Sequence, residues 1–214
     1  MCRLLYINSK NNFSISENLQ KFSEISKNSK EFQGHGWGCA YIENGNWSYY
    51  KNVKPIWEDD FSKFGSTTRL IVHARSAFKD EGIVVENNMP FYDDKYLFIF
   101  NGQLSGVKIK ENGRIGAEKI FNYIKRFDKG NIKDALHKGT EIIKKKSDFI
   151  RAMNIIITDA DAAYVFSHFN EDEEYFTMSA KVSSDMITVC SDPFIGEEGW
   201  EEIKNNSLTE YKCF

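Results

Sequence analysis

Residues 96–102 read Tyr-Leu-Phe-Ile-Phe-Asn-Gly, an uninterrupted apolar run that stops at an Asn-Gly pair. A short run rich in aromatic and branched residues is typical of a strand buried on both faces. Two interpretations of Asn101-Gly102 remain open. The pair forms either a hairpin turn, as we expect for Asn112-Gly113, or a set of N–H donors for a negatively charged oxygen. The residues alone favour the turn.

Outward from this run, strands are expected at both ends of the chain and helices near the start and in the middle. A helix is expected from Ser14 or Ser16 to about Ser26, and Asn44-Gly45 predicts a type I′ hairpin turn. Two further helices carry apolar faces over 120–127 and 132–143. The other predicted strands are 2–7, 39–42, 47–51, 69–74, 154–158, 162–167, 175–179 and 186–190. The pattern favours one mixed domain with hairpin-built antiparallel sheets and helices on their faces.

Composition excludes several classes of protein. The 214 residues are 41% hydrophobic and 14% aromatic, which is enough apolar material for a substantial core. The net charge of −3 offers no basic excess for nucleic acid. No apolar run approaches the roughly 20 residues of a membrane span, and the N-terminus does not resemble a secretory signal. We therefore expect a cytoplasmic protein that binds neither nucleic acid nor membrane.

The four cysteines, Cys2, Cys39, Cys190 and Cys213, are scattered and form no Cys-x-x-Cys pair. This spacing favours neither a disulfide framework nor a zinc site, so most of these thiols are expected to be small buried apolar residues. No metal or organic cofactor is expected. A thiol redox protein is a weaker alternative, because no resolving partner is apparent.

Cys2 has a second interpretation. If Met1 is removed, Cys2 carries both a thiol and a free α-amine, whose pKa of about 8 suits a base near neutral pH. A base and a nucleophile on the same residue form an N-terminal nucleophile. Taken alone, however, a cysteine at this position is better explained as a small strand residue.

Five short segments strengthen the case for chemistry at Cys2. Together they resemble the class II glutamine amidotransferases, in particular the stand-alone, single-domain branch. The resemblance spans nearly the whole chain and implies a four-layer αββα sandwich of the N-terminal nucleophile hydrolase superfamily, with residues 1–214 as one glutamine amidotransferase type 2-like domain. The segments are Met1-Cys2-Arg3-Leu4, Gly34-His35-Gly36-Trp37-Gly38, His73-Ala74-Arg75-Ser76-Ala77, Phe98-Ile99-Phe100-Asn101-Gly102-Gln103-Leu104 and Cys190-Ser191-Asp192-Pro193-Phe194.

The resemblance assigns roles to the residues of these segments. Cys2 is the catalytic nucleophile, and Asn101 with Gly102 forms the oxyanion hole, which reverses the preference for a turn. Arg75 binds the α-carboxylate of the substrate; from the residues alone, an internal ion pair is the better explanation. Trp37 is expected to cover the pocket.

The pocket also departs from the family pattern. Ser76 replaces an aromatic or basic residue, and Met89 replaces a histidine. Gly116 stands where the family has the aspartate that pairs with the substrate's α-ammonium. Either a nearby acid such as Glu111 substitutes, or the substrate lacks a free α-amine, or turnover is lost.

The resemblance therefore implies cysteine-dependent hydrolysis of a glutamine-like or γ-glutamyl amide through a Cys2 thioester. Hydrolysis is slightly preferred over a role as the glutaminase subunit of an amidotransferase, which would require a separate synthetase subunit. A homodimer is left open. The alternative is a catalytically silent binding or regulatory member of the same fold.

Overall fold

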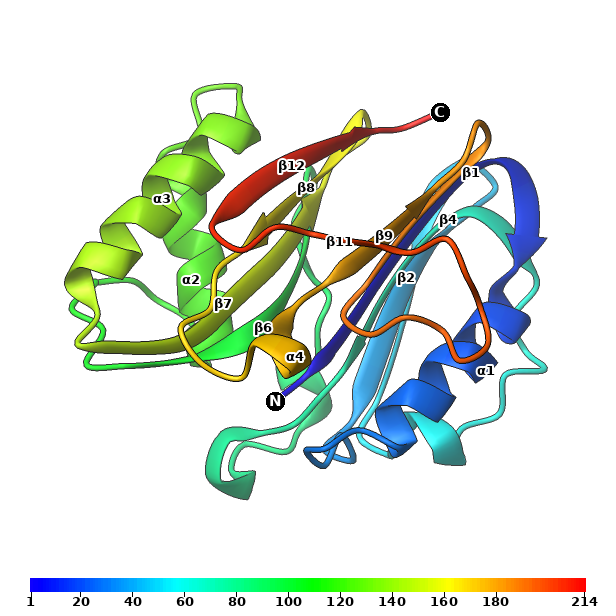
Figure 1. The fold of residues 1–214 in the computed structure, drawn as a ribbon, viewed down its shortest axis with the longest axis horizontal. Coiled ribbons are helices and arrows are strands. Elements are labelled where there is room, and N and C mark those ends of the chain that lie inside the picture. Colours follow the sequence, from blue (N-terminus) through cyan, green and yellow to red (C-terminus); the bar gives the residue numbers. More distant parts are fainter.

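Two antiparallel sheets lie face to face, with helices on the outer face of each (Figure 1). The computed structural model describes the backbone of residues 1–214 and every side chain except that of residue 80. The first sheet has seven strands in the order β11-β9-β10-β1-β4-β2-β3, and the second has five in the order β12-β8-β7-β6-β5. Strands of the first sheet are β1 (Arg3–Ser14), β2 (Trp37–Glu43), β3 (Asn46–Asn52), β4 (Ser66–Ala74), β9 (Ser179–Val182), β10 (Met186–Cys190) and β11 (Glu201–Glu202). Those of the second are β5 (Phe91–Tyr92), β6 (Leu97–Ser105), β7 (Phe149–Thr158), β8 (Ala162–Ser167) and β12 (Ser207–Lys212).

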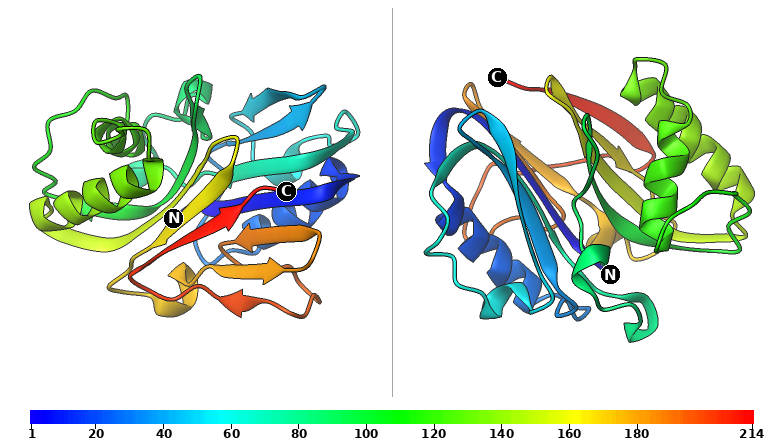
Figure 2. Two further views of the ribbon diagram at one scale, coloured as in Figure 1. Left: turned by 90° about the horizontal axis from the view of Figure 1, so that it is seen from above. Right: turned by 180° about the vertical axis from the view of Figure 1, so that it is seen from behind.

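Helix α1 (Ile15–Lys27) covers the seven-stranded sheet, whereas α2 (Gly116–Lys125) and α3 (Ile132–Lys146) cover the five-stranded sheet (Figure 2). A short helix, α4 (Glu173–Phe176), lies near the N-terminus of the chain (Figure 1). Three 3₁₀ turns, η1 (Ile56–Glu58), η2 (Phe78–Asp80) and η3 (Val85–Asn87), lie in the loops. This arrangement confirms the four-layer αββα sandwich expected from the sequence.

The alternation of side chains along the strands determines which residues face the space between the sheets. In β1, Leu4 and Tyr6 belong to the core between the sheets, whereas Leu5 and Ile7 belong to the core beneath α1. Cys2 has the same parity as Leu4 and therefore faces the space between the sheets.

The same alternation sets the direction of Asn101 in β6. Phe98 stacks on Phe121 of α2 with ring centroids 4.9 Å apart, so the even-numbered residues of this strand face the helices. Asn101 is odd-numbered and points toward the seven-stranded sheet. The fold thus directs Cys2 and Asn101 into the same layer from opposite sheets.

Several local predictions are confirmed. Ser14 caps α1, because its hydroxyl accepts a hydrogen bond from the N–H of Glu17 at 3.2 Å. Asn44 and Gly45 have positive φ values of 51° and 77°, as a type I′ turn requires. Cys39 and Cys190 are buried free thiols.

Two local predictions are wrong, and a turn that the residues alone favour is not found. Of the strand predicted over 175–179, only Ser179 lies in a strand, because Tyr175 and Phe176 belong to α4 and pack on Ala152 and Phe169. Asn112-Gly113 lies in the loop between β6 and α2 rather than in a hairpin turn. Asn101-Gly102 lies inside β6, paired with Asn154 and Met153 of β7, and so is not a turn.

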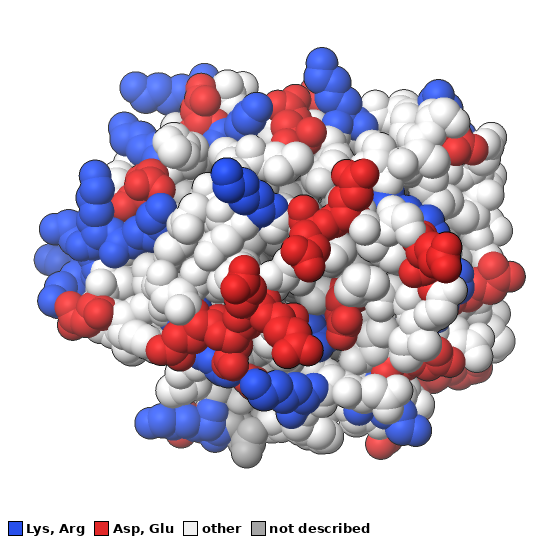
Figure 3. All heavy atoms as spheres, in the orientation of Figure 1, with Lys and Arg blue, Asp and Glu red and all other residues white. Residues whose placement is uncertain are grey.

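The charged surface is mixed. Acidic side chains gather across the middle of the face shown in Figure 3, and basic side chains gather at its left edge, where α3 lies. Within the described part of the chain, no helix is both long enough and apolar enough to cross a membrane.

Candidate functional site

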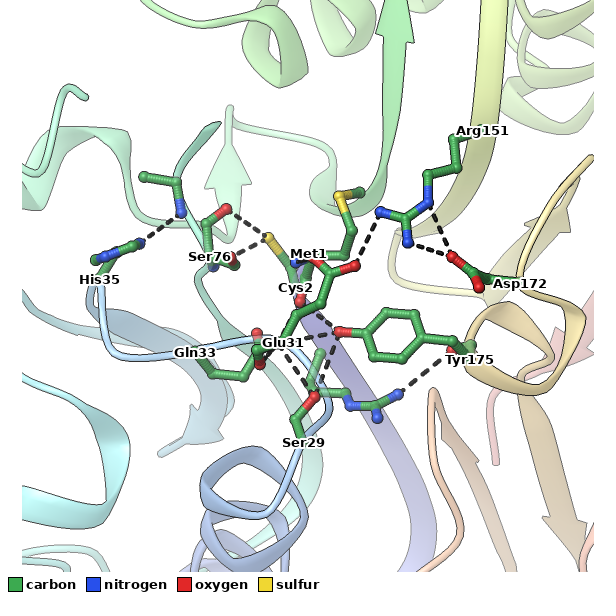
Figure 4. Close-up of polar contacts among 12 residues, drawn as sticks. Met1, Cys2, Ser29, Glu31, Gln33, His35, Ser76, Arg151, Asp172 and Tyr175 are labelled. Carbon is green, nitrogen blue, oxygen red and sulfur yellow. Dashed lines mark hydrogen bonds and ion pairs between the residues drawn. The ribbon is translucent and has the colours of Figure 1, made fainter. Parts of the chain in front are cut away.

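The Cys2 thiol lies where β1 begins and β4 ends. Arg3 pairs with Ala74 in the antiparallel ladder, which brings Cys2 beside the residues that follow β4. The thiol sulfur accepts the N–H of Ser76 at 3.4 Å and lies 3.6 Å from the Ser76 carbonyl oxygen (Figure 4). Cys2 is only 8% exposed. The segment after Arg75 therefore holds the sulfur through its backbone, and the Ser76 side chain has no part in that contact.

Burial raises the pKa of the Cys2 thiol. The positive N-terminus, the N–H of Ser76 and the guanidinium of Arg75 favour the thiolate but do not outweigh burial, and Glu31 opposes them. A buried thiol with a raised pKa is neutral near pH 7 and needs a base to become a nucleophile. The α-amine that removal of Met1 would create on Cys2 is suited to that role.

Arg75 is a buried cation beside this thiol. It is 5% exposed, and its guanidinium donates to two backbone carbonyl oxygens, those of Gly82 at 2.9 Å and Glu81 at 3.5 Å. Among the described side chains, no carboxylate forms an ion pair with it. Arginine keeps its charge in proteins and binds carboxylates through two parallel hydrogen bonds. The internal ion pair that the residues alone favour is therefore not found among the described side chains, and the described partners of the guanidinium are backbone carbonyl oxygens.

Backbone hydrogen bonds attach the glycine-rich segment to Arg75. The N–H of Arg75 donates to Gly36 O at 2.8 Å, and the N–H of His35 donates to Arg75 O at 3.1 Å. The ring Nδ1 of His35 accepts the N–H of Ala77 at 2.8 Å. His35 therefore shapes the loop around Arg75 and Ser76.

His73 is fully buried in β4, two residues before Arg75. Burial and the neighbouring guanidinium of Arg75 lower the pKa of His73 to about 3. The imidazole is therefore neutral at physiological pH. It pairs across the sheet with Leu4 and Gly38, which fits a structural role.

Asn101 is a fully buried amide in β6. Neither its Oδ1 nor its Nδ2 has a hydrogen-bond partner among the residues that the structure describes. Most buried polar groups in proteins are satisfied, so a buried amide without a partner calls for an explanation. A ligand oxygen in the layer between the sheets would supply one.

Gly102 has a steric requirement of its own. A Cβ atom at this position would lie 2.2 Å from the carbonyl oxygen of Ala152 on β7. We expect Gly102→Ala to lower the free energy of unfolding by about 1–3 kcal/mol, because β6 would have to move away from β7. Gly116→Ala is the matched control, since a Cβ there would meet nothing within 4 Å. Urea denaturation of both variants checks the prediction, and equal stabilities would contradict it.

Trp37 lies away from the thiol. Its ring is fully buried beneath α1, on the opposite face of the sheet from Cys2, and its Nε1 donates to Asp59 at 2.9 Å. The expectation that Trp37 covers the pocket therefore does not agree with its position. Trp37 is the first residue of β2, and the alternation of side chains along this strand directs its ring into the core beneath α1.

Asp59 organises the cluster around Trp37. Burial opposes its charge, but hydrogen bonds from Lys63, Tyr50, Asn52 and Trp37 prevail and lower the pKa of Asp59 to about 2. A carboxyl whose pKa is lowered by folding stabilises the protein above its unfolded pKa of about 3.9, and this contribution is lost as the pH falls through the folded pKa. We therefore expect stability to fall by about 2 kcal/mol between pH 5 and pH 2 on account of this one group.

Thermal unfolding at several pH values checks that expectation. Asp59→Asn should flatten the loss of stability in this acid range, whereas the same change at the exposed Asp94 should leave it intact. An unchanged pH profile for Asp59→Asn would contradict the assignment.

The other predicted positions, Met89 and Gly116, have no described contact with Cys2. Met89 is buried in the core between the sheets. Gly116 begins α2 in open space, and no side chain occupies the place of the family's aspartate there. Glu111, the acid considered as its substitute, pairs with Arg126 at 3.5 Å.

Sequence reasoning missed the residues that surround Met1. The Met1 ammonium forms an ion pair with Glu31, and the Met1 carbonyl oxygen accepts hydrogen bonds from Tyr175 and Gln33 (Figure 4). Arg151 in turn binds Glu31 at 2.8 Å. The one sequence signal for these contacts with Met1 is that Glu31 and Gln33 lie just before the glycine-rich segment.

A cleft of about 550 Å³ lies between β3, β5 and α2, away from Cys2, and its lining includes Lys51, Tyr92 and Arg114. The described residues include no group of three or more His, Cys, Asp or Glu side chains placed to hold a metal ion.

Solved structures share this architecture over the whole chain. Glutamine phosphoribosylpyrophosphate amidotransferase from B. subtilis matches 99% of the chain with a TM-score of 0.69 at 15% identity. A predicted glutamine amidotransferase from Pseudomonas aeruginosa matches 99% of the chain with a TM-score of 0.61 at 16% identity. A glutamine aminotransferase class-II domain protein from Silicibacter pomeroyi matches 100% of the chain with a TM-score of 0.61 at 14% identity. The chain has the fold of the class II glutamine amidotransferases.

The extent of the match differs among these neighbours. The chain spans 49% of the length of the B. subtilis enzyme, but 97% and 100% of the other two proteins. The glutamine amidotransferase fold therefore occurs both as part of a larger enzyme and as a chain of this size. No protein-family model and no curated protein matches the sequence.

Proposed function

We propose that this chain, after removal of Met1, hydrolyses the side-chain amide of glutamine or of a γ-glutamyl compound through a thioester on Cys2. The observation that carries the proposal is the buried amide of Asn101, which has no partner among the described residues and faces the layer that holds Cys2. The shared fold of class II glutamine amidotransferases supports it at the level of the reaction class.

The proposed reaction begins with the α-amine of Cys2 taking the proton of its own thiol. The thiolate attacks the carbonyl carbon of the amide, and negative charge develops on the carbonyl oxygen. The Nδ2–H of Asn101 would stabilise this charge, with the N–H of Gly102 as a second candidate donor. The α-ammonium returns the proton to the departing amine as the carbon–nitrogen bond breaks. Water then attacks the thioester, gives its proton to the α-amine, and releases the acid and the free thiol.

Arg75 would hold the substrate's carboxylate during these steps. It lies beside the thiol, is buried, and donates only to backbone carbonyl groups among the described residues. A planar guanidinium in this state suits bidentate binding of a carboxylate.

Two measurements test the proposal. Intact-mass analysis should show a chain that begins at Cys2, and a chloroketone analogue of glutamine should label that residue. Release of ammonia from glutamine, or of an amine from a γ-glutamyl panel, should accompany labelling. A chain that retains Met1, or one that neither labels nor turns over, would contradict the proposal. Ammonia release by the isolated chain would favour hydrolysis over transfer through a synthetase subunit.

A silent binding member of the same fold is the second candidate function. The open space at Gly116 favours it, because the family's acidic partner for an α-ammonium is missing there. Labelling of Cys2 without any turnover of the panel would support this alternative.

A further inference from the structure

Met1 is held in the structure as a ligand would be. Its ammonium group pairs with the carboxylate of Glu31. Its carbonyl oxygen accepts the hydroxyl of Tyr175 at 2.7 Å and a hydrogen bond from the Gln33 amide. These groups come from α4 and from the segment before the glycine-rich turn, and Figure 4 shows them converging on the residue next to Cys2.

The Met1 side chain occupies an apolar site of its own. It packs against a small core cluster that is separate from the two main cores. Its members are Ala152, Phe169, Tyr175 and Phe176. Aromatic walls of this kind suit a thioether or aliphatic side chain.

The polar part of the site persists without Met1. Arg151 binds one oxygen of Glu31 at 2.8 Å, and its Nε donates to Asp172 at 3.1 Å. The other oxygen of Glu31 has the Met1 ammonium as its ion-pair partner. Gln33 is fully buried, and its amide nitrogen is also held by the hydroxyl of Tyr175 at 3.1 Å. Removal of Met1 therefore leaves an aligned set of donors and acceptors around an empty space.

We propose that the space vacated by Met1 is a binding site, beside the nucleophile, for an α-amino acid with an apolar side chain. Glu31 binds the ammonium group of this ligand, and Tyr175 and Gln33 bind a carboxylate oxygen. Cleavage of the Met1–Cys2 peptide bond creates a carboxylate on one side and an ammonium on the other. The ligand's carboxylate therefore also faces the new α-ammonium of Cys2, with opposite charge.

This inference rests on the proposed function only for the removal of Met1. It has a consequence for reactivity. A carboxylate against the α-ammonium of Cys2 favours the protonated form of that amine. An amino acid in this site therefore slows the proton transfer that activates the thiol, and the site acts as a point of inhibition.

Calorimetry on protein that begins at Cys2 tests the inference. A fusion protein cleaved directly before Cys2 supplies this chain even if cells retain Met1. L-methionine and L-leucine should bind. N-acetyl-L-methionine, which has no ammonium group, should bind at least about tenfold more weakly. Protein that retains Met1 should bind none of them.

Variants identify the residues responsible. Glu31→Gln should weaken methionine binding at least about tenfold. Tyr175→Phe, which keeps the ring, should weaken it by a smaller factor through loss of one hydrogen bond. Glu24→Gln, at an exposed position on α1, is the matched control and should bind as the parent does. Methionine should also slow alkylation of Cys2 in the parent and not in Glu31→Gln.

Two outcomes would overturn the inference: no binding of methionine to the chain that begins at Cys2, or methionine binding that Glu31→Gln does not weaken. The readout needs no turnover. Hydrolysis of glutamine without methionine binding would therefore reject this site and keep the proposed function. Methionine binding without hydrolysis would keep this site and reject the proposed function.

Discussion

Cys2→Ala should abolish turnover of a γ-glutamyl amide, with a fall in kcat of about 10⁴-fold or more. Loss of a covalent nucleophile removes the whole reaction path, and such residues show effects of this size. The substitution removes only the sulfur, whose contacts are to the backbone of Ser76. Stability should therefore change little, and ammonia release by the purified variant measures the loss.

Cys213→Ala is the matched control for that experiment. Cys213 is a partly buried thiol near the C-terminus, in contact with the hydroxyl of Tyr6 at 3.5 Å. Its removal should leave labelling by a glutamine chloroketone and turnover unchanged. Activity that survives in Cys2→Ala, or that disappears in Cys213→Ala, would show that the nucleophile has been misassigned.

Asn101→Ala should lower kcat by about 10²–10³-fold while leaving KM nearly unchanged. Removing one oxyanion donor typically costs about 2.7–4 kcal/mol of transition-state stabilisation. The stability of the folded state should depend little on the polar atoms of this amide, because it has no partner among the described residues. Kinetics with saturating substrate and urea denaturation measure the two effects separately.

Asn154 provides the contrast, because it lies opposite Asn101 on β7. Its amide donates to Phe176 O at 2.7 Å, and its Oδ1 accepts the N–H of His168 at 3.3 Å. Asn154→Ala leaves both partners unsatisfied and should cost about 1–3 kcal/mol of stability. If Asn101→Ala instead loses stability and keeps its kcat, its amide is a structural group and the oxyanion assignment fails.

Much of the fold could be predicted from local pattern. Ser14 before an apolar periodicity predicts the start of α1, and the Asn44-Gly45 pair predicts the turn between β2 and β3. Both signals depend on a few neighbouring residues. The prediction for 175–179 failed because Tyr175 and Phe176 are apolar in a way that suits a strand or a helix equally, and packing on Phe169 decided the outcome.

The candidate site was only partly predictable for a similar reason. The family resemblance indicated Cys2, Arg75 and Asn101, and the pairing of the strands explains why Cys2 and Asn101 lie in the same layer. The direction of the Trp37 ring depends on which face of the sheet it points to, and a sequence motif does not show this. Tyr175 reaches Met1 across 174 residues of sequence. No spacing rule connects residues so far apart, and only the folded chain brings them together.

If Met1 is removed as proposed, its burial also sets an order of events during synthesis. Its side chain is 12% exposed, its ammonium is bound to Glu31, and the strand that follows it pairs on both edges with β4 and β10. An aminopeptidase needs a free, flexible chain end, and a central strand opens only in rare, large fluctuations. Trimming would therefore have to reach the nascent polypeptide before β10, near the C-terminus, has left the ribosome. A molecule that folds first would keep Met1, so the yield of the trimmed protein would depend on the relative rates of proteolysis and folding.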